Sequence, residues 1–421
     1  MGEQVNSPAR ILTASLVGTT IEFFDFYIFA TAAVLVFPHL FFPTSDPTSA
    51  VLQSFATFSI AFFARPLGAA VFGHYGDRIG RKATLVAALM TMGLSTVMIG
   101  FLPGYDTVGV FAPLLLAICR FGQGLGLGGE WGGAVLLATE NAPPHRRSWY
   151  AMFPQLGAPL GFVLSATSFL LLTETLTNEQ FLSWGWRIPF VSSLLLVLLG
   201  LYVRLKITET PEFQKAVDTE ARVAVPILDL LRSHKRALLL GTLVALATFV
   251  LFYLMTVFSL SWATSKLGYS RERYLEIQLI GVAFFAATIP LAAWLSDRYG
   301  RRTVLLIATG CTGVFGLFFE PLLANGLVGA LAFNVVGLAL MGFNYGPIGA
   351  ALASPFPVSV RYTGASMTFN LAGIFGASLA PYIATWLALN FSLAWVGYYL
   401  LAACLLTLAA MVISRDAELS S

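Results

Sequence analysis

Long apolar runs separated by short polar breaks dominate the pattern of hydrophobic and polar positions along this chain. Each run is about as long as the roughly 20 apolar residues that a helix needs to cross a lipid bilayer. The breaks contain glycine, proline or clusters of charge. The pattern predicts twelve transmembrane helices, over residues 11–37, 52–74, 83–102, 109–139, 148–172, 185–204, 236–263, 274–296, 303–322, 327–350, 361–388 and 394–413.

Composition supports a membrane protein. Hydrophobic residues make up 57% of the 421 residues and charged residues only 11%, whereas soluble domains carry about 25% charged residues. The longest polar stretch, 206–235, is predicted to carry short amphipathic helices and to join two halves, residues 1–205 and 236–421. The polar N-terminus leads into an apolar run too long for a signal peptide, so no cleaved signal is expected.

Most of the 24 Lys and Arg residues fall in alternate breaks between the predicted spans. Positively charged loops stay in the cytoplasm, and this rule places both termini there. The segments predicted on the outer side contain few basic residues, which are Lys266, Arg271 and Arg273. Cys119, Cys311 and Cys404 each lie within an apolar run and are interpreted as small packing residues.

The chain also repeats itself. The segment GHYGDRIGRK (73–82) follows the second predicted span, and AWLSDRYGRR (293–302) follows the eighth. A looser match relates Arg146, Gln155 and Gly161 in the fifth span to Arg361, Asn370 and Gly376 in the eleventh. Two six-helix halves are the simplest explanation, and repeated halves around a central site are typical of secondary transporters.

The repeated GxxxDRxGRK pattern resembles the signature of the major facilitator superfamily, and the likeness extends over the whole chain. Further motifs are similar to those of the bacterial metabolite:proton symporter family, which includes shikimate, α-ketoglutarate, citrate and proline/betaine carriers. Within it, the chain most resembles a functionally unassigned inner-membrane member beside the shikimate carrier. These motifs are RPLG (65–68), RFGQGLGLGGEWGGA (120–134), SWGWRIPF (183–190), ETPEF (209–213) and VRYTGAS (360–366).

The resemblance implies an all-α membrane fold of twelve transmembrane helices in two pseudo-symmetric six-helix bundles. It also implies proton symport of a small organic acid or zwitterion across the bacterial inner membrane by alternating access. Two rivals stay open: an uncoupled facilitator or exporter on the same fold, and a membrane receptor that binds a solute without moving it. The absence of an output domain in the sequence and the duplicated loop argue against the receptor.

The duplicated loop is predicted to act as a conformational latch between the halves that steadies an outward-open state. An aspartate there can accept hydrogen bonds from helix N-terminal amides, and glycine permits a tight turn and close helix approach. Orientation by positive charge is the simpler alternative, but it does not explain the aspartate or the repetition. The predicted latch residues are Gly73, Asp77, Arg78, Gly80 and Arg81 in the first copy and Asp297, Arg298 and Arg301 in the second.

A glycine-rich run in the fourth span contains G-x-G-x-x-G at Gly124, Gly126 and Gly129. A dinucleotide site would require a preceding strand in a βαβ unit, and this run lies within an apolar helix. Small residues instead let membrane helices pack closely. The run is therefore interpreted as a packing surface, with Gly122, Gly126, Gly129 and Gly133 on one helical face.

Five ionisable residues are predicted at membrane depth: Glu22, Asp25, Arg65, Arg120 and Glu130. Such residues are costly in hydrocarbon and usually mark ion or substrate pathways. A carboxylate that loses a cationic partner takes up a proton, and one that gains a partner releases it. We expect Asp25 above all, with Glu22 and Glu130, to bind the coupling proton. A static internal salt network is the alternative.

Arg65 and Arg120 are the predicted ligands of an anionic substrate, because the planar guanidinium donates two parallel hydrogen bonds to a carboxylate. Either arginine could instead only neutralise a buried acid. Gln155, Tyr253, Asn344 and Tyr345 lie in mid-span and are predicted to complete the site. For each of these four, a hydrogen bond to a neighbouring helix is the alternative.

No enzyme, cofactor or metal site is expected. The four histidines, His39, His74, His145 and His234, lie at span ends or in loops without metal-ligand spacing. No catalytic triad, phosphate-binding loop or nucleic-acid motif is present in the sequence, so ATP-driven transport is not expected. The expected partners are a small metabolite, protons and the lipid bilayer, and a monomer suffices for this role.

Overall fold

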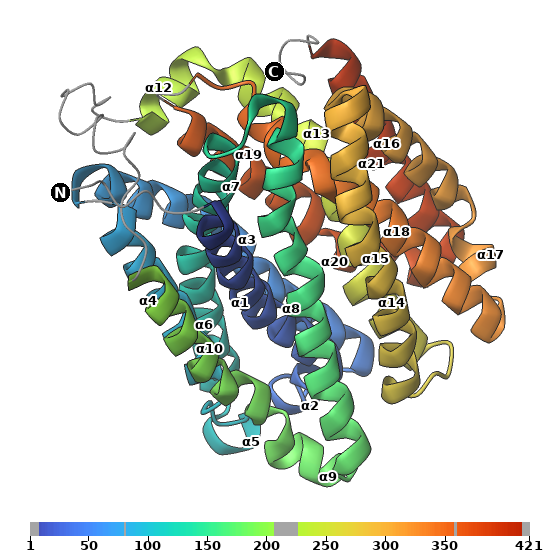
Figure 1. Ribbon diagram of the computed structural model, residues 1–421. Coiled ribbons are helices and arrows are strands. Elements are labelled where there is room, and N and C mark those ends of the chain that lie inside the picture. Colours follow the sequence, from blue (N-terminus) through green and yellow to red (C-terminus); the bar gives the residue numbers. More distant parts are fainter. Residues whose placement is uncertain (1–7, 80, 206–225, 358–359, 415–421) are drawn as a thin grey trace.

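The computed structural model describes residues 8–79, 81–205, 226–357 and 360–414, with the side chains of residues 73–85 and a few others excluded. Within these ranges the chain is helical and contains no β-strand (Figure 1). The helices run roughly along one common direction, and the first helix starts at the same end of the bundle at which the last helix finishes.

The first half consists of seven longer helices and three short ones. The longer helices are α1 (Pro8–Leu35), α3 (Pro47–Ile79), α4 (Arg81–Ile99), α6 (Phe111–Gly128), α7 (Glu130–Glu140), α8 (Arg147–Thr175) and α10 (Arg187–Leu205). The short helices are α2 (Phe37–Leu40), α5 (Tyr105–Val108) and α9 (Asn178–Gln180). The predicted span 109–139 is therefore broken at Gly129, where α6 ends and α7 begins.

The second half follows the same plan with more interruptions. Its helices are α13 (Lys235–Tyr253), α14 (Ser259–Ser265), α15 (Arg271–Tyr299), α16 (Arg301–Leu317), α17 (Phe319–Leu323), α18 (Gly326–Ala353), α19 (Arg361–Ala372), α20 (Ala380–Asn390) and α21 (Leu393–Ile413). A π-helical turn, Leu254–Phe258, joins α13 to α14, and another, Gly373–Ser378, lies between α19 and α20. Such turns are frequent at functional sites.

The predicted spans agree with the helices of the structure. Nine helical segments among the described residues are long and apolar enough to cross a membrane, and a bent pair, Asn178–Gly185 with Arg187–Val203, provides a tenth. The two remaining predicted spans correspond to α4, whose apolar part is Val86–Ile99, and to the 17-residue α16. The all-α, twelve-helix membrane fold is therefore confirmed.

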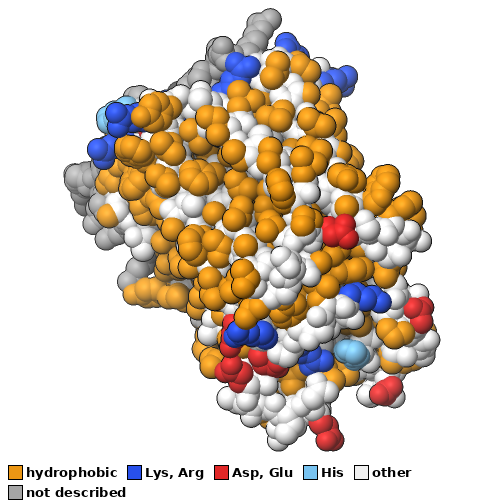
Figure 2. Space-filling model, turned by 90° about the vertical axis from the view of Figure 1, so that its right-hand side faces the viewer, with side chains coloured by type: hydrophobic (Ala, Val, Ile, Leu, Met, Phe, Trp, Pro, Cys, Tyr) orange, Lys and Arg blue, Asp and Glu red, His pale blue; other side chains and the backbone are white. Residues whose placement is uncertain are grey.

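The surface of the bundle is apolar between two charged ends. Large hydrophobic side chains such as Leu195, Val328 and Val412 are more than 60% exposed. Figure 2 shows one face on which hydrophobic side chains cover most of the middle, while charged side chains gather mainly toward the upper and lower ends. An exposed apolar belt of this kind is the surface that a bilayer solvates.

Glycines bring helices of the first half close together, as the sequence predicts. A Cβ atom on Gly124 would lie 2.4 Å from the carbonyl oxygen of Ala61 in α3, and one on Gly126 would lie 2.6 Å from that of Ala88 in α4. Backbones at this distance leave no room for a side chain. The glycine-rich run of α6 is therefore a packing surface that contacts both neighbouring helices.

The two ends of the bundle carry different elements. We call the end that carries the start of α8, the end of α15 and α12 (Pro226–Ser233) the latch end, and the end that carries α5 and α9 the opposite end (Figure 1). Helix α12 belongs to the predicted linker, and its Leu230 is buried against Leu238, Phe356 and Val360. Residues 206–225 lie outside the described ranges, so the predicted half boundaries stay a prediction.

Candidate functional site

A central cavity lies between the two halves. It is narrow, with about 20 Å³ of space that a water molecule can occupy, and it is lined by side chains from both halves, including one cation, Arg65. Most of its wall is aromatic: Phe23, Tyr27, Phe249, Phe252, Tyr253, Tyr345 and Phe369. Tyr253 and Tyr345, predicted as site residues, therefore do line this cavity, whereas Arg120, Gln155 and Asn344 do not belong to its lining.

Arg65 is the charged group of the cavity. Its side chain is only 5% exposed, and its guanidinium lies over the rings of Phe26 and Phe62 at 4.8 and 4.9 Å. Its Nε finds no hydrogen-bond acceptor, and no described carboxylate lies within 4.0 Å of the guanidinium. Aromatic faces stabilise a buried cation by about 2 kcal/mol, which offsets only part of the cost of removing it from water.

Arg120 has different surroundings. It is completely buried inside the first half, where its guanidinium lies 4.1–4.8 Å from the centres of three phenylalanine rings, those of Phe26, Phe29 and Phe58. Its Nη1 donates to Gln123 Oε1 at 2.9 Å and its Nε to the Phe58 carbonyl at 3.3 Å. One ring, that of Phe26, thus contacts the guanidiniums of both Arg120 and Arg65.

Asp25 precedes Phe26 and is also buried within the first half. Only 1% of its side chain is exposed, and its Oδ1 accepts a hydrogen bond of 2.5 Å from the Ser193 hydroxyl of α10. Neither Arg65 nor Arg120 lies within ion-pair distance of Asp25. Glu22 and Glu130, the other two predicted proton carriers, are 4% and 2% exposed. All five predicted ionisable residues are therefore buried in the first half.

The other predicted polar residues bind neighbouring helices. Gln155 Oε1 accepts from the indole N–H of Trp131 at 3.0 Å, and its Nε2 donates to the Tyr345 carbonyl in the second half at 3.1 Å. Asn344 accepts from the Thr309 hydroxyl and donates to that of Thr312, each at 3.0 Å, so it joins α18 to α16.

Contacts between the halves close the path from the cavity to the latch end. Trp131 of α7 stacks on Phe369 of α19, with ring centres 3.7 Å apart and planes 10° from parallel. Beside this stack, Tyr362 donates to the Gly129 carbonyl and Asn370 donates to the Gly128 carbonyl. The sequence does not indicate this stack, because an aromatic residue in an apolar helix gives no sign of its partner.

At the latch end, Asp297 joins α15 to the start of α8. Its two carboxylate oxygens accept hydrogen bonds from the backbone N–H groups of Ser148 and Trp149, each at 3.0 Å. A carboxylate is favourable there because the N-terminus of a helix carries a partial positive charge. Gly300 turns the chain directly after α15 with φ of +89°, a conformation that glycine adopts without strain. This geometry is what a latch between halves requires.

The remaining latch residues are less informative. Arg301 donates to the Ala350 carbonyl within the second half, and Arg298 lies over the rings of Trp294 and Tyr299. The side chains of the first copy, predicted as Gly73, Asp77, Arg78, Gly80 and Arg81, lie outside the described residues. The role of the latch stays a prediction.

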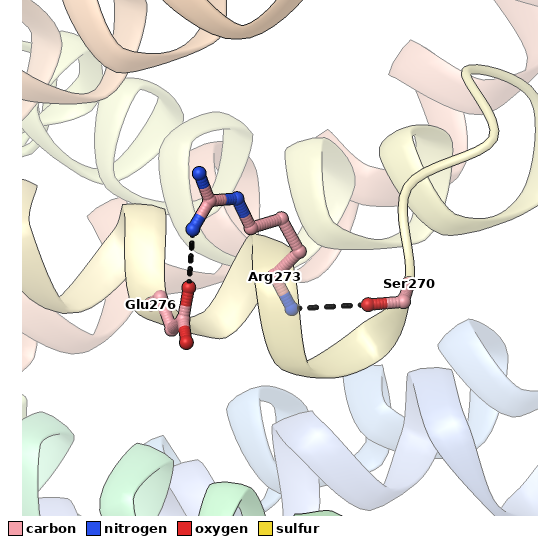
Figure 3. A network of polar contacts seen from close by, with 3 residues as sticks. All are labelled: Ser270, Arg273 and Glu276. Carbon is pink, nitrogen blue, oxygen red and sulfur yellow. Dashed lines mark hydrogen bonds and ion pairs between the residues drawn. The ribbon is translucent and has the colours of Figure 1, made fainter.

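The opposite end is hollowed between the halves. A cleft of about 550 Å³ there includes His39, Lys266 and Arg271 in its wall. Burial, with a smaller contribution from the Arg271 charge, holds the pKa of His39 below its usual value. Beside the cleft, Ser270 caps α15 by accepting from the Arg273 N–H at 3.2 Å, and Arg273 pairs with Glu276 at 2.8 Å (Figure 3). Contacts between the halves thus close the latch end, whereas a cleft separates parts of the halves at the opposite end, where Arg271 Nη1 donates across to Asn178 Oδ1 at 2.9 Å.

Comparison with protein families agrees with this architecture. The family model described as "Sugar (and other) transporter" matches residues 11–228 and 215–414. The chain belongs to this transporter family. It is not an enzyme family, and among the described residues no group of three or more His, Cys, Asp and Glu side chains could hold a metal ion.

Relatives within the family are transport proteins. The chain is 56% identical to the inner membrane metabolite transport protein YhjE of Escherichia coli K12, over 98% of this chain and 95% of that one. It is 37% identical to the shikimate transporter of the same organism, over 97% and 95%. It is 33% identical to the E. coli proline/betaine transporter, over 90% of this chain and 77% of that one.

Solved structures show the same fold. The major facilitator superfamily proton:xylose symporter XylE, bound to 6-bromo-6-deoxy-D-glucose, superposes with a TM-score of 0.72 at 18% identity, covering 96% of this chain and 94% of that one. The predicted resemblance to the major facilitator superfamily, and the prediction of a metabolite transporter, are confirmed.

Proposed function

We propose that this transporter is a proton-coupled symporter that imports a small organic acid across the bacterial inner membrane by alternating access. One observation carries the proposal: the buried Arg65 guanidinium faces the central cavity and has no ion pair among the described residues. An unpaired charge at membrane depth is costly. A carboxylate on the solute neutralises it and matches its two parallel donors.

Asp25 is the proposed carrier of the coupling proton. A carboxylate held in low-dielectric surroundings without a cationic partner favours its protonated form, and one that gains such a partner releases the proton. Asp25 lies next to Phe26, whose ring contacts both Arg65 and Arg120. A rearrangement of this ring on solute binding changes the surroundings of Asp25. Glu22 and Glu130 are the further candidates.

Alternating access requires the contacts at the latch end to open while the cleft at the opposite end closes. Basic residues gather at the latch end, so we assign it, together with both chain termini, to the cytoplasm. Asp297 then steadies the state that is open to the outside. We further propose that the halves are residues 1–205 and 236–421 with a linker at 206–235, and that the monomer is the working unit.

Two properties of similar proteins support the proposal. The relatives named as shikimate and proline/betaine transporters point to a small acid or zwitterion as the solute. The symporter XylE, which has the same fold, is named for its coupling to protons.

The test is external pH in lightly buffered, de-energised cells that express the protein, with candidate acids added one at a time. We expect alkalinisation with the transported acid, and its loss in Asp25→Asn. The matched control is Asp106→Asn, which makes the same change at an exposed position in α5 and is expected to behave as the wild type.

Solute-driven alkalinisation that persists in both Asp25→Asn and Glu22→Gln would contradict the proposed proton site. Uptake of labelled acid by the wild type without any movement of protons would replace the symporter by an uncoupled facilitator.

A further inference from the structure

We infer that the transported solute is a monocarboxylate with an uncharged, ring-shaped body, rather than a di- or tricarboxylate or a quaternary-ammonium zwitterion. The inference rests on the proposed function, because it takes the central cavity as the transport site. It follows from the charge of the residues that line the cavity and from the aromatic character of most of them.

The charge of the cavity matches one negative charge. Arg65 is the one cation among the residues that line it, and none of those residues is acidic. The buried Glu22 lies outside the lining, although its charge interacts with Tyr27 and Tyr345 of the wall. Arg120 lies outside the lining, enclosed by three phenylalanine rings and bonded to Gln123. A single carboxylate therefore neutralises the cavity. A second carboxylate would be buried without a partner, which strongly disfavours its binding.

The same balance argues against a zwitterion. Aromatic rings do bind quaternary ammonium groups, and this wall is rich in them. However, a zwitterion brings no net charge: its carboxylate would pair with Arg65, and its ammonium group would then be the uncompensated charge in a low-dielectric site. No carboxylate in the lining is available to offset the ammonium group.

The aromatic side chains that line the cavity favour a solute with a ring. Phe23 and Tyr27 stack on each other in α1, with centres 5.6 Å apart, and Tyr27 lies 5.6 Å from Phe252 of the second half. Aromatic and apolar faces from both halves therefore meet around the cavity, and a ring offers them more contact than a flexible chain at a lower cost in entropy. The Tyr27 hydroxyl is buried and without a hydrogen-bond partner, so it can serve one polar substituent on the ring.

The experiment measures stabilisation of the purified, detergent-solubilised protein by six probes. These are 4-hydroxybenzoate, cyclohexanecarboxylate, hexanoate, succinate, citrate and glycine betaine. We expect the two ring monocarboxylates to bind at least tenfold more tightly than the other four. Arg65→Gln is expected to abolish this binding, and Arg65→Lys to restore part of it, because lysine keeps the charge without the planar fork.

The control is Arg273→Gln, which makes the same chemical change at an exposed arginine paired with Glu276 (Figure 3). It is expected to leave every affinity unchanged. Tyr27→Phe tests the polar contact separately: it is expected to weaken binding of 4-hydroxybenzoate about fivefold, the effect of one hydrogen bond, and to leave cyclohexanecarboxylate unaffected.

Tightest binding of succinate, citrate or glycine betaine would overturn the inference, as would failure of both ring acids to bind. The experiments distinguish an error in the solute class from an error in the proposed proton symport. If succinate or glycine betaine drives proton uptake through Asp25, the symporter stands and the solute class is wrong. If a ring acid binds through Arg65 without moving protons, the solute class stands and the symporter is wrong.

Discussion

The two halves of this transporter share a fold but differ in chemistry. Six charged side chains are buried among the described residues, and five of them lie within the first half. The sixth, Arg301, lies at the latch end of α16. Buried polar groups in the spans of the second half are neutral, as with Gln278, which donates to the carbonyls of Met255 and Thr256. We interpret the first half as the site of charge and proton chemistry.

The second half contributes aromatic walls and irregular backbone instead. Tyr253 ends α13 directly before a π-helical turn and contacts the rings of Phe58 and Phe62 across the interface at 5.7 and 5.5 Å. The corresponding helix of the first half, α1, is continuous. In this duplicated fold, the first half thus contains the buried charged residues and the second half contributes aromatic walls and irregular backbone. The predictions below test this division.

The largest effect is expected from exchanging the cavity cation for a neutral residue. Arg65→Gln removes the group that pairs with the solute carboxylate, and losing one partner of a buried charged pair costs about 3–5 kcal/mol. Solute affinity should fall by at least two orders of magnitude, as measured by binding to the purified protein. Arg120→Gln, in the same half but outside the cavity lining, is expected to keep most of the affinity. An equal loss in both variants would contradict the separation of these two arginines.

A smaller effect is expected at Phe26, the ring shared by both guanidiniums. Phe26→Leu keeps an apolar side chain but removes two cation–π contacts at 4.8 and 4.4 Å, each worth about 2 kcal/mol when desolvated. We expect proton uptake per transported solute to fall, since the ring is the contact between the solute site and the surroundings of Asp25. Phe258→Leu, an equally buried phenylalanine of the second half, is the matched control. Unchanged coupling in Phe26→Leu would show that the two sites communicate by another route.

The hydropathy pattern and the repeat were sufficient to predict the twelve helices and the depth of all five ionisable residues. Depth follows from position along a helix, which the sequence displays directly. The direction in which a side chain points around the helix axis cannot be read from the sequence, because every face of a buried membrane helix is apolar. The sequence could therefore not tell that Arg65 lines the cavity while Arg120 lies among phenylalanines, nor that Gln155 bonds to Trp131. The break at Gly129 could not be predicted either, because a glycine-rich sequence occurs both within closely packed membrane helices and at breaks between helices.

A moderate effect is expected at the latch. Asp297→Ala removes two hydrogen bonds and a favourable charge at the start of α8, worth about 1–2 kcal/mol together. The population open at the latch end should rise about five- to thirtyfold, as measured by the rate at which a cysteine introduced beside the cavity is labelled from that side. Asp297→Asn keeps one hydrogen-bond acceptor, so its labelling rate should lie between those of Asp297→Ala and the wild type. Asp77→Ala, the repeat counterpart, is expected to match Asp297→Ala, and a difference between them would show that the duplicated loops do different work.

The smallest effect is expected from the neutral polar groups of the second half. Asn344→Leu removes hydrogen bonds with Thr309 and Thr312, and such interhelical bonds in membranes average only about 0.6 kcal/mol. Thermal stability should fall slightly, because the threonine hydroxyls can turn to carbonyls one helical turn back, as Thr312 already does with Ala308. Solute affinity and proton uptake should not change, since Asn344 does not line the cavity. If this variant impaired solute binding as Arg65→Gln does, the second half would contribute more than shape to recognition.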